Sequence, residues 1–449
     1  MVNISNVEAP ASPGFAAGRD DDKLFTRVIW RILPLVAIAY FLAYLDRVNI
    51  SFAQLQMQTD IGFSAAVYGF GAGIFFIGYC LFEVPCNLIL ERIGTRKTLF
   101  GMLFLWGLAA SANAFVTTPT QFYIVRFLLG TVEAGLFPGV IFYLSLWLPG
   151  KRRAQAVAIF MIASIVSGVV GGPISGWIMS AFDGVAGWKG WHWLLLLEGL
   201  PSTLFGIVLY FSLADRPSDV TWLSATEQAH IADVLAAEDE VARSVSRSHT
   251  FVKVLADPKL YILLAASFMT LCSVYGIMFW IPQMIRGAGV SNLFHIGLYA
   301  MVPHAVTIAT MYIIGRHSDR TRERRWHFAV MVAIGAAGLM LCTVIPKNLP
   351  LTLIGLSISE SALMCVLPIF WAIARSVLTS GSAAGGLAFI NSVANLGGFV
   401  APSIIGYVQT ATGSMGYGLM TVAIITLLAA AVILLGVSKQ AMAAERLKE

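Results

Sequence analysis

Long apolar runs alternate with short polar segments along the whole chain. A helix that crosses the hydrocarbon core of a bilayer needs about 20 consecutive, mainly apolar residues. Six runs of that kind precede a charged central segment, and six follow it. The runs span residues 30–52, 66–90, 98–116, 121–148, 154–181 and 192–213, then 259–285, 293–315, 327–345, 350–375, 384–410 and 415–437. The pattern predicts an all-α membrane protein with 12 transmembrane helices in two six-helix bundles.

The polar segments divide the chain into five parts. In the charged central segment, Ser224 and Glu227 have the spacing of an N-terminal capping box, so we expect one short helix there, over 224–238. Residues 1–28 are polar, so the first apolar run is expected to direct insertion. The predicted parts are an N-terminal tail (1–28), a first bundle (29–213), a central loop (214–257), a second bundle (258–437) and a C-terminal tail (438–449).

The composition agrees with a membrane protein. Of the 449 residues, 58% are apolar and 12% are charged, against about 45–50% and about 25% in soluble domains. All five cysteines lie inside apolar runs without the spacing of metal ligands, so we expect them to pack in the interior. They are Cys80, Cys86, Cys272, Cys342 and Cys365. We therefore expect no cofactor and no metal.

The net charge of +5 could indicate an anionic macromolecule as a partner. The positions of the 29 Lys and Arg residues argue otherwise, because 24 lie on one side of the predicted bundle and three lie on the other. Lys and Arg in short loops are retained in the cytoplasm. Both termini and the central loop are therefore predicted to be cytoplasmic, and the basic residues are expected to line a bilayer surface rather than bind nucleic acid.

Landmarks in the first half of the chain recur in the second half. Glu91 and Asp319 each follow an apolar helix, precede an arginine and a basic cluster, and are 228 residues apart. Glu133 and Glu360 are 227 residues apart. The sequence therefore predicts a two-fold repeat of six helices. Such repeats in transporters place the substrate site near the bilayer midplane, between the halves.

Seven charged residues fall inside the predicted helices, away from the helix ends. An ionised side chain at the centre of a membrane helix costs roughly 2.5–3.5 kcal/mol, so each of these residues is expected to have a function or a partner that offsets this cost. Buried carboxyl groups can exchange protons, while the planar fork of an arginine matches a carboxylate ligand. The alternative is a static network of ion pairs. The seven are Asp46, Arg47, Glu83, Arg126, Glu133, Glu198 and Glu360.

Several motifs resemble known families of transporters. Residues 315–325 resemble the loop motif of the major facilitator superfamily, and residues 87–97 resemble it with Glu91 in place of the usual Asp. Four further strings resemble the anion:cation symporter family, and within it the bacterial permeases for phthalate, tartrate and 4-hydroxyphenylacetate. These strings lie at 44–51, 82–85, 133–139 and 391–398. The resemblance covers about residues 25–437 and implies the major facilitator fold.

The resemblance implies roles for the charged residues of the first half. The matching acids of helices 1 and 4 in these symporters are proton sites, which gives Asp46 and Glu133 here. The arginine after the helix 1 acid contacts the substrate anion, which gives Arg47, and Arg126 would bias Glu133. Further candidates for substrate contact, each of which could instead make an interhelical hydrogen bond or pack, are Tyr44, Tyr79, Asn391, Asn395 and Trp371.

Other residues are expected to act in gating and packing. The loop-motif residues could pair with neighbouring helix ends when the cytoplasmic side is shut, or could only set the topology. They are Glu91, Arg92, Arg96, Asp319 and Arg320. Gly168, Gly172 and Gly176 have a spacing that permits close helix packing. His304 could relay protons or be a satisfied core histidine, and the roles of Glu83, Glu198 and Glu360 are left open.

These observations predict a proton-coupled importer of an organic carboxylate in the bacterial inner membrane. Its partners would be a small organic anion, protons and the lipid bilayer, and we expect a monomer. An antiporter that exports a metabolite or drug, a passive facilitator and a membrane enzyme are the alternatives. The enzyme is disfavoured because the chain has no zinc-ligand helix, no nucleophile elbow and no phosphate-binding Gly-Lys-Ser.

Overall fold

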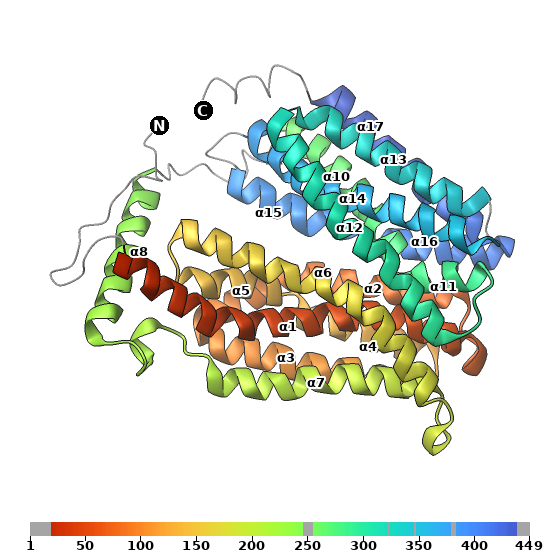
Figure 1. The fold of residues 1–449 in the computed structure, drawn as a ribbon, viewed down its shortest axis with the longest axis horizontal. Coiled ribbons are helices and arrows are strands. Elements are labelled where there is room, and N and C mark those ends of the chain that lie inside the picture. Colours follow the sequence, from red (N-terminus) through yellow and green to blue (C-terminus); the bar gives the residue numbers. More distant parts are fainter. Residues whose placement is uncertain (1–18, 246–254, 322, 345–346, 379–382, 438–449) are drawn as a thin grey trace.

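The computed structural model describes residues 19–245, 255–321, 323–344, 347–378 and 383–437. Within these residues, 12 helical segments are long and apolar enough to cross a membrane. They are arranged as two bundles of six, which form the lower and upper parts of Figure 1. This architecture confirms the predicted all-α fold with 12 spans in two halves.

The first half contains the first six spans. Its helices are α1 (Arg19–Asp60), α2 (Ala65–Ile93), α3 (Thr95–Ala112), α4 (Pro119–Glu133), α5 (Leu136–Ser145), α6 (Gly150–Ala181) and α7 (Gly190–Ser212). Helix α1 begins within the segment assigned to the N-terminal tail, because Leu24, Phe25 and Val28 are buried on its inner face. Short 3-10 helices lie in this half and just after it, namely η2 (Asn113–Phe115), η3 (Val185–Gly187) and η4 (Pro217–Asp219).

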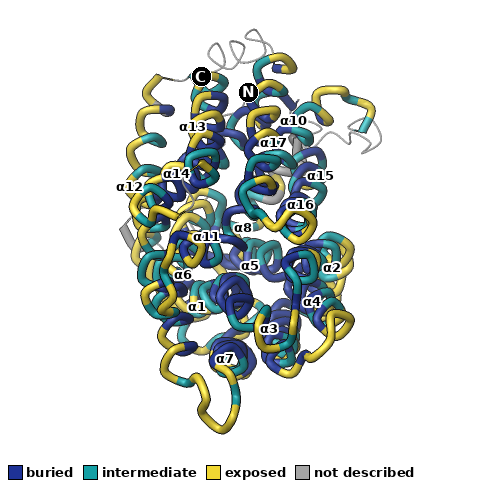
Figure 2. The backbone as a smooth tube through the Cα atoms, turned by 90° about the vertical axis from the view of Figure 1, so that its right-hand side faces the viewer, coloured by how far each residue is buried: buried dark blue, intermediate teal, exposed yellow. Residues whose placement is uncertain are grey.

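The second half contains the other six spans. Its helices are α10 (Pro258–Met278), α11 (Ile281–Gly287), α12 (Leu293–Thr321), α13 (Arg324–Val344), α14 (Leu349–Val377), α15 (Ala383–Ala394), α16 (Gly397–Thr412) and α17 (Met415–Gly436). Each half contains buried residues, whose backbone is dark blue when the molecule is viewed along its length (Figure 2).

In three of the predicted spans the helix is interrupted, and the sequence pattern gave no sign of these interruptions. The span of α4 and α5 is interrupted at Ala134 and Gly135. The span of α10 and α11 is interrupted just before Pro282, which lies in the first turn of α11. The span of α15 and α16 is interrupted after Ala394 and resumes at a pair of glycines. Glycine and proline favour such interruptions because they weaken or block helical hydrogen bonding.

The central loop contains α8 (Ala225–Val245), which is longer than the predicted helix. The predicted capping box is confirmed, because the Ser224 N–H donates to Glu227 at 2.8 Å and the Glu227 N–H donates to the Ser224 hydroxyl at 3.3 Å. Glu227 also pairs with Arg27 of α1. Just before α8, Trp222 stacks on Trp147 with a centroid distance of 6.1 Å. Helix α8 and the segment before it are therefore anchored to the first half.

The two halves pack most closely at one end of the molecule. We call this the α11 end and the opposite one, where α1 begins, the α8 end; they lie at the right and left of Figure 1. Along α2, α6 and α12, most residues nearer the α8 end are exposed or half-buried, and more become buried toward the α11 end. Leu81, Ile162 and Ile313 illustrate the exposed parts, with exposed fractions of 60%, 53% and 63%. The halves are therefore shut at the α11 end.

Glycines make the close contact at the α11 end possible. A Cβ atom on Gly172 of α6 would lie 2.8 Å from the carbonyl oxygen of Gly297 on α12. A Cβ atom on Gly176 would lie 2.6 Å from the carbonyl oxygen of Leu293. The packing role predicted for Gly172 and Gly176 is thus confirmed. The same contact recurs by symmetry between α2 and α16, where Gly73 faces the Phe399 backbone.

Candidate functional site

An ion pair lies at the centre of the first half. Arg47 of α1 donates from Nε to the Glu133 carboxylate at 2.6 Å, and its Nη2 contacts the same oxygen. The Arg47 side chain is 11% exposed and that of Glu133 is 2% exposed. Glu133 is the last residue of α4, directly before the interruption of that span. The predicted proton site and the predicted anion ligand are therefore in direct contact.

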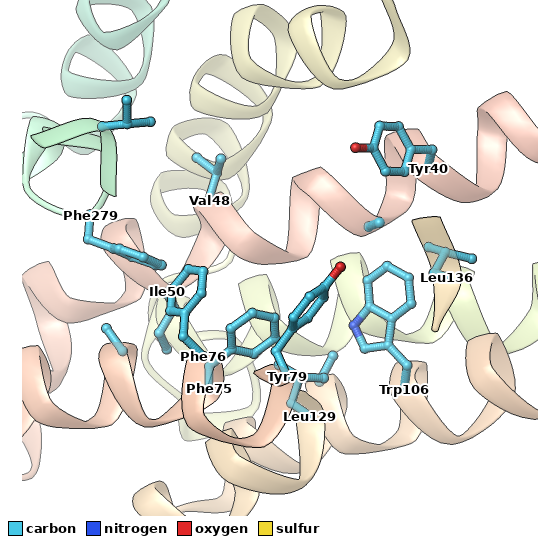
Figure 3. Packing of buried hydrophobic residues seen from close by; sticks show 14 of the residues in the cluster. Tyr40, Val48, Ile50, Phe75, Phe76, Tyr79, Trp106, Leu129, Leu136 and Phe279 are labelled. Atoms are coloured by element: carbon cyan, nitrogen blue, oxygen red, sulfur yellow. The ribbon is translucent and has the colours of Figure 1, made fainter. Parts of the chain in front are cut away.

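Aromatic rings surround the Arg47 guanidinium. Its carbon lies 4.9 Å from the ring centroid of Tyr44 and 5.5 Å from those of Phe75 and Tyr79. Figure 3 shows Phe75, Phe76 and Tyr79 grouped beside α1. Ring faces attract a cation electrostatically, most strongly where water is excluded. The aromatic side chains therefore hold the guanidinium in place beside Glu133.

Asp46 lies next to Arg47 in sequence but belongs to a different cluster. Its carboxylate is 2% exposed and accepts a hydrogen bond from the Asn49 side-chain amide at 2.8 Å. Arg126 and Glu133 interact with it electrostatically. The prediction that Asp46 and Arg47 need not pair agrees with this arrangement. Asp46 is thus buried inside the first bundle, with Asn49 as its hydrogen-bond partner.

Arg126 is buried without a carboxylate in hydrogen-bonding contact. Its Nε donates to the Gly71 carbonyl at 3.4 Å, and its guanidinium lies 5.3 Å from the Phe75 ring centroid. Within the part of the chain that the structure describes, one buried atom of each of Asp46, Arg126 and Glu133 has no hydrogen-bond partner. These atoms are Asp46 Oδ2, Arg126 Nη2 and Glu133 Oε2. Both acids therefore keep an oxygen that can accept a proton without breaking an existing hydrogen bond.

Glu198 is a third buried acid in this bundle, and sequence reasoning assigned it no role. It lies on α7, is 1% exposed, and accepts a hydrogen bond from the Ser175 hydroxyl at 2.9 Å. It interacts electrostatically with Asp46, and Asn49 interacts with both carboxyl groups. Asp46 and Glu198 therefore belong to one buried polar cluster, together with Asn49 and Ser175.

The second half contributes polar groups from α10 and from the interruption after α15. The Tyr275 hydroxyl donates to the Asn395 side-chain oxygen at 3.1 Å, and the Asn395 amide donates to the Asn391 carbonyl at 3.0 Å. The Tyr275 ring packs on Phe76 of the first half, at 4.4 Å between centroids. Tyr275 also interacts electrostatically with Arg47. It connects the two halves at the site, and sequence reasoning missed it.

The remaining substrate candidates have less direct positions. Tyr44 accepts a weak hydrogen bond from the Tyr40 hydroxyl at 3.5 Å, which leaves its ring beside Arg47. Asn391 is half-buried, and its backbone carbonyl is the group that contacts Asn395. Trp371 packs edge-on against Phe370 within the apolar cluster of the second half. Packing is thus the observed role of Trp371, and the structure does not bring it to the Arg47 site.

The loop-motif residues lie at the α8 end. Glu91, Arg92 and Arg320 are exposed. The backbone N–H of Arg96 donates to Asp215 at 2.8 Å, so Asp215, not Glu91, caps the start of α3. The Arg96 side chain donates to the Tyr210 carbonyl. The side chain of Asp319 lies outside the described residues.

The family follows from comparison with known sequences. A profile of the Major Facilitator Superfamily matches residues 36–402. The chain belongs to this superfamily. Solved structures of the superfamily share its fold, including an inward-facing bacterial homologue of the human lysosomal transporter Spinster (TM-score 0.75, 15% identity, 90% of this chain and 96% of that one). A D-xylose-proton symporter aligns with a TM-score of 0.71 at 16% identity, over 92% and 98% of the two chains.

Bacterial transporters match the chain over nearly its whole length. It is 43% identical to NicT of Pseudomonas putida, named for metabolite transport, over 92% of this chain and 93% of that one. It is 42% identical to an Agrobacterium vitis protein named for tartrate transport, over 90% and 92%. It is 35% identical to a quinolone resistance transporter of Acinetobacter baumannii, over 89% and 92%. These relatives bear out the resemblance to the anion:cation symporters. The protein is a secondary transporter, not an enzyme.

Proposed function

We propose that this transporter imports an organic carboxylate together with protons across the bacterial inner membrane. The observation that carries the proposal is the buried contact between Arg47 and Glu133. A substrate carboxylate and the Glu133 carboxylate compete for the same guanidinium. Protonation of Glu133 removes its charge and frees Arg47 for the substrate, so proton binding and anion binding favour each other.

The geometry favours this competition over a purely static pair. Removing one partner of a buried ion pair leaves an uncompensated charge, at a cost of about 3–5 kcal/mol. A bound carboxylate would restore that compensation, since arginine can donate two parallel hydrogen bonds to carboxylate oxygens. Glu133 then remains neutral while the substrate is bound. In this scheme Asp46, with Asn49 and Glu198 around it, takes the other proton, and Arg126 biases both acids.

The groups around Arg47 indicate the class of substrate. Tyr44 and Tyr79 offer ring faces and hydroxyl groups, while Tyr275 and Asn395 offer polar groups from the second half. This mixture suits a carboxylate that carries either an aromatic ring or several hydroxyl groups. The Agrobacterium vitis relative named for tartrate transport agrees with a hydroxy acid. Tartrate and phthalate are therefore the first compounds to test.

The proposal also assigns the molecule an orientation in the membrane. The excess of Lys and Arg in the loops and tails at the α8 end supports a cytoplasmic location for that end and for both termini. The state that is shut at the α11 end is then inward-facing. Rocking of the halves would close the α8 end and open the α11 end, with the loop-motif residues Glu91, Arg92, Arg96, Asp319 and Arg320 taking part in closure.

Uptake by proteoliposomes tests the proposal. Radiolabelled L-tartrate and phthalate are offered with an inward proton gradient, with and without a protonophore. We expect accumulation that collapses with the protonophore. Glu133→Gln mimics the protonated acid, so it should retain binding in a thermal-shift assay, with less dependence on pH, and should lose pH-driven uptake. Full pH-driven uptake by this variant would refute the coupling role, and Glu240→Gln on the exposed face of α8 is the matched control.

Arg47→Ala tests the anion site separately. We expect it to abolish both uptake and thermal stabilisation by the same two compounds, whereas Lys189→Ala, at an exposed position, should change neither. Retained stabilisation in Arg47→Ala would remove Arg47 from the binding site. Similarity to a quinolone resistance transporter favours one alternative, an exporter that exchanges its substrate for protons. Accumulation that falls when the outside is acidified would favour that exporter.

A further inference from the structure

A histidine and a glutamate form a second buried pair, in the half of the molecule that does not contain Arg47. His304 lies on α12 and Glu360 on α14, and the imidazole Nδ1 is in direct contact with the carboxylate Oε1. The side chains are 16% and 8% exposed. The second carboxylate oxygen, Oε2, is buried without a hydrogen-bond partner among the described residues. An acid and a base in such contact can hold one proton between them.

This pair touches the first half where the two halves are shut. A Cβ atom on Gly168 of α6 would lie 3.3 Å from the His304 ring, so the imidazole packs directly on the α6 backbone. His304 also lines a small cavity between the halves, together with Ser51 of α1, Gly172 of α6 and Pro282 of α11. A change of charge on the pair therefore changes the stability of the contact between α6 and α12, which exists only when the α11 end is shut.

Few other titratable groups face the pair. Helix α6 has no titratable side chain between Arg153 at its first turn and its end at Ala181. On α11, Arg286 is directed to the Leu55 carbonyl of α1. Glu360 is the group that interacts electrostatically with His304, and the other titratable residues of α12, α13 and α14 and of the adjoining α10 lie at other positions along these helices. Those residues are Lys259, Tyr261, Cys272, Tyr275, His295, Tyr299, Tyr312, Arg316, His317, Asp319, Arg320, Arg324, Arg325, His327, Cys342, Cys365 and Arg375.

The charge of the pair depends on a single proton. When the pair holds that proton, it has no net charge. This is so whether an imidazolium lies beside a carboxylate or a neutral imidazole lies beside a carboxylic acid. Without the proton, a neutral imidazole lies beside a carboxylate, and the shut interface encloses one negative charge. Burying a charge without compensation is costly, whereas water can solvate it once the halves part. The protonated pair is therefore compatible with the shut α11 end, and the deprotonated pair favours opening.

We infer that His304 and Glu360 form a second proton-binding site, which links proton uptake to closure of the α11 end. The inference deepens the proposed function, on which its role in transport rests, by adding a proton site in the second half. By linkage, closure raises the affinity of the pair for a proton as much as the proton favours closure. A proton taken from the α11 side would thus help to shut that side behind the substrate.

Hydrogen–deuterium exchange without any substrate tests the site. Peptides that cover residues 167–181 and 293–304 report the α11 end, and variants are compared at the same pD so that intrinsic exchange rates cancel. Wild-type protein should exchange faster in these peptides as pD rises from acid to alkaline values. Glu360→Gln cannot ionise and should lose this pD-dependent difference, and His304→Gln should lose it as well.

Ser361→Ala is the matched control. The Ser361 hydroxyl lies 3.1 Å from the Thr307 hydroxyl, so the variant loses a contact between the same two helices without removing a titratable group. It should keep the wild-type difference. The inference is overturned if Glu360→Gln and His304→Gln both keep the wild-type pD dependence. Loss of that dependence in Ser361→Ala as well would also overturn it, since packing alone would then explain the effect.

Transport supplies the second measurement. Proton and L-tartrate fluxes are recorded together in proteoliposomes, with a trapped pH dye and radiolabel. Glu360→Gln should move one fewer proton per tartrate than the wild type, and an unchanged ratio would overturn the role in coupling. If wild-type protein takes up no tartrate or phthalate at all, the proposed function fails, while the exchange experiment still decides whether His304 and Glu360 bind a proton.

Discussion

Closure of the α11 end depends on the absence of a side chain at Gly172, so Gly172→Ala should weaken it. The added methyl group would lie 2.8 Å from the Gly297 carbonyl oxygen, and real Cβ atoms essentially never approach that closely. The obstacle is backbone, which cannot rotate away as the end of a side chain can. Helices α6 and α12 must therefore separate slightly, and in the shut state the facing surfaces of both helices lose packing contacts.

The magnitude follows from the cost of overpacking. An extra methyl group in a close-packed contact costs about 1–3 kcal/mol. That cost falls only on the state that is shut at the α11 end, because the contact is absent when the halves part. The equilibrium should therefore move toward the open state by roughly 5- to 150-fold. The gain in helix propensity from Gly to Ala, up to about 1 kcal/mol, applies to both states and cancels.

Exchange protection at the α11 end measures this shift. Gly101→Ala is the control, because a Cβ atom there would meet nothing within 4 Å and the substitution is chemically the same. Peptides over 167–181 and 293–304 should lose protection in Gly172→Ala, while Gly101→Ala should match the wild type. Equal protection in the two variants would refute the argument that the glycine contact limits closure.

Two further predictions concern the contacts of α8. Glu238→Ala should destabilise the protein by about 0.5–2 kcal/mol in thermal unfolding. The reason is that both Glu238 oxygens accept a hydrogen bond from the first backbone N–H of α6, at 2.9 and 3.1 Å. Glu240→Ala is the control and should leave the stability unchanged. Partial burial raises the pKa of Glu227, but the Ser224 N–H and the Arg27 guanidinium outweigh it and hold that pKa below its ordinary range. The ionised Glu227 carboxylate therefore stabilises the fold at neutral pH, and this stabilisation is lost as pH falls through the folded-state pKa. Glu227→Gln should flatten the acid side of a Tm-versus-pH curve.

The sequence was sufficient for the number and order of the spans but not for their interruptions. Membrane helices are dictated by local apolar length, which a single sequence contains. The interruptions after Glu133 and Ala394 depend on what the neighbouring helices can hydrogen-bond or pack against, because glycines at similar spacing in α6 leave that helix continuous. The length of α8 was likewise underestimated, since its contacts with α1 and α6 come from distant parts of the chain.

The sequence was sufficient to find the charged residues of the candidate site that lie within apolar helices, but not to find an uncharged one. Asp46, Arg47 and Glu133 stand out because a charge within an apolar helix requires a reason. Tyr275 gives no such signal, since tyrosine is common in membrane helices, and only the packing of α10 on α2 places it beside Phe76. Asp215 lies in a polar loop, and its capping of α3 depends on how α7 packs against that helix.

Alternating access requires that each proton site respond to the contact between the halves. In the proposed mechanism, the Arg47–Glu133 pair of the first half responds to the substrate through competition for the guanidinium. The His304–Glu360 pair lies in the second half and contacts α6 at Gly168, so in the same mechanism it responds to closure itself. A transporter with only the first kind of site could bind proton and substrate together, yet close equally well without them. A site of the second kind makes closure dependent on the proton, which prevents leakage in the absence of the driving ion.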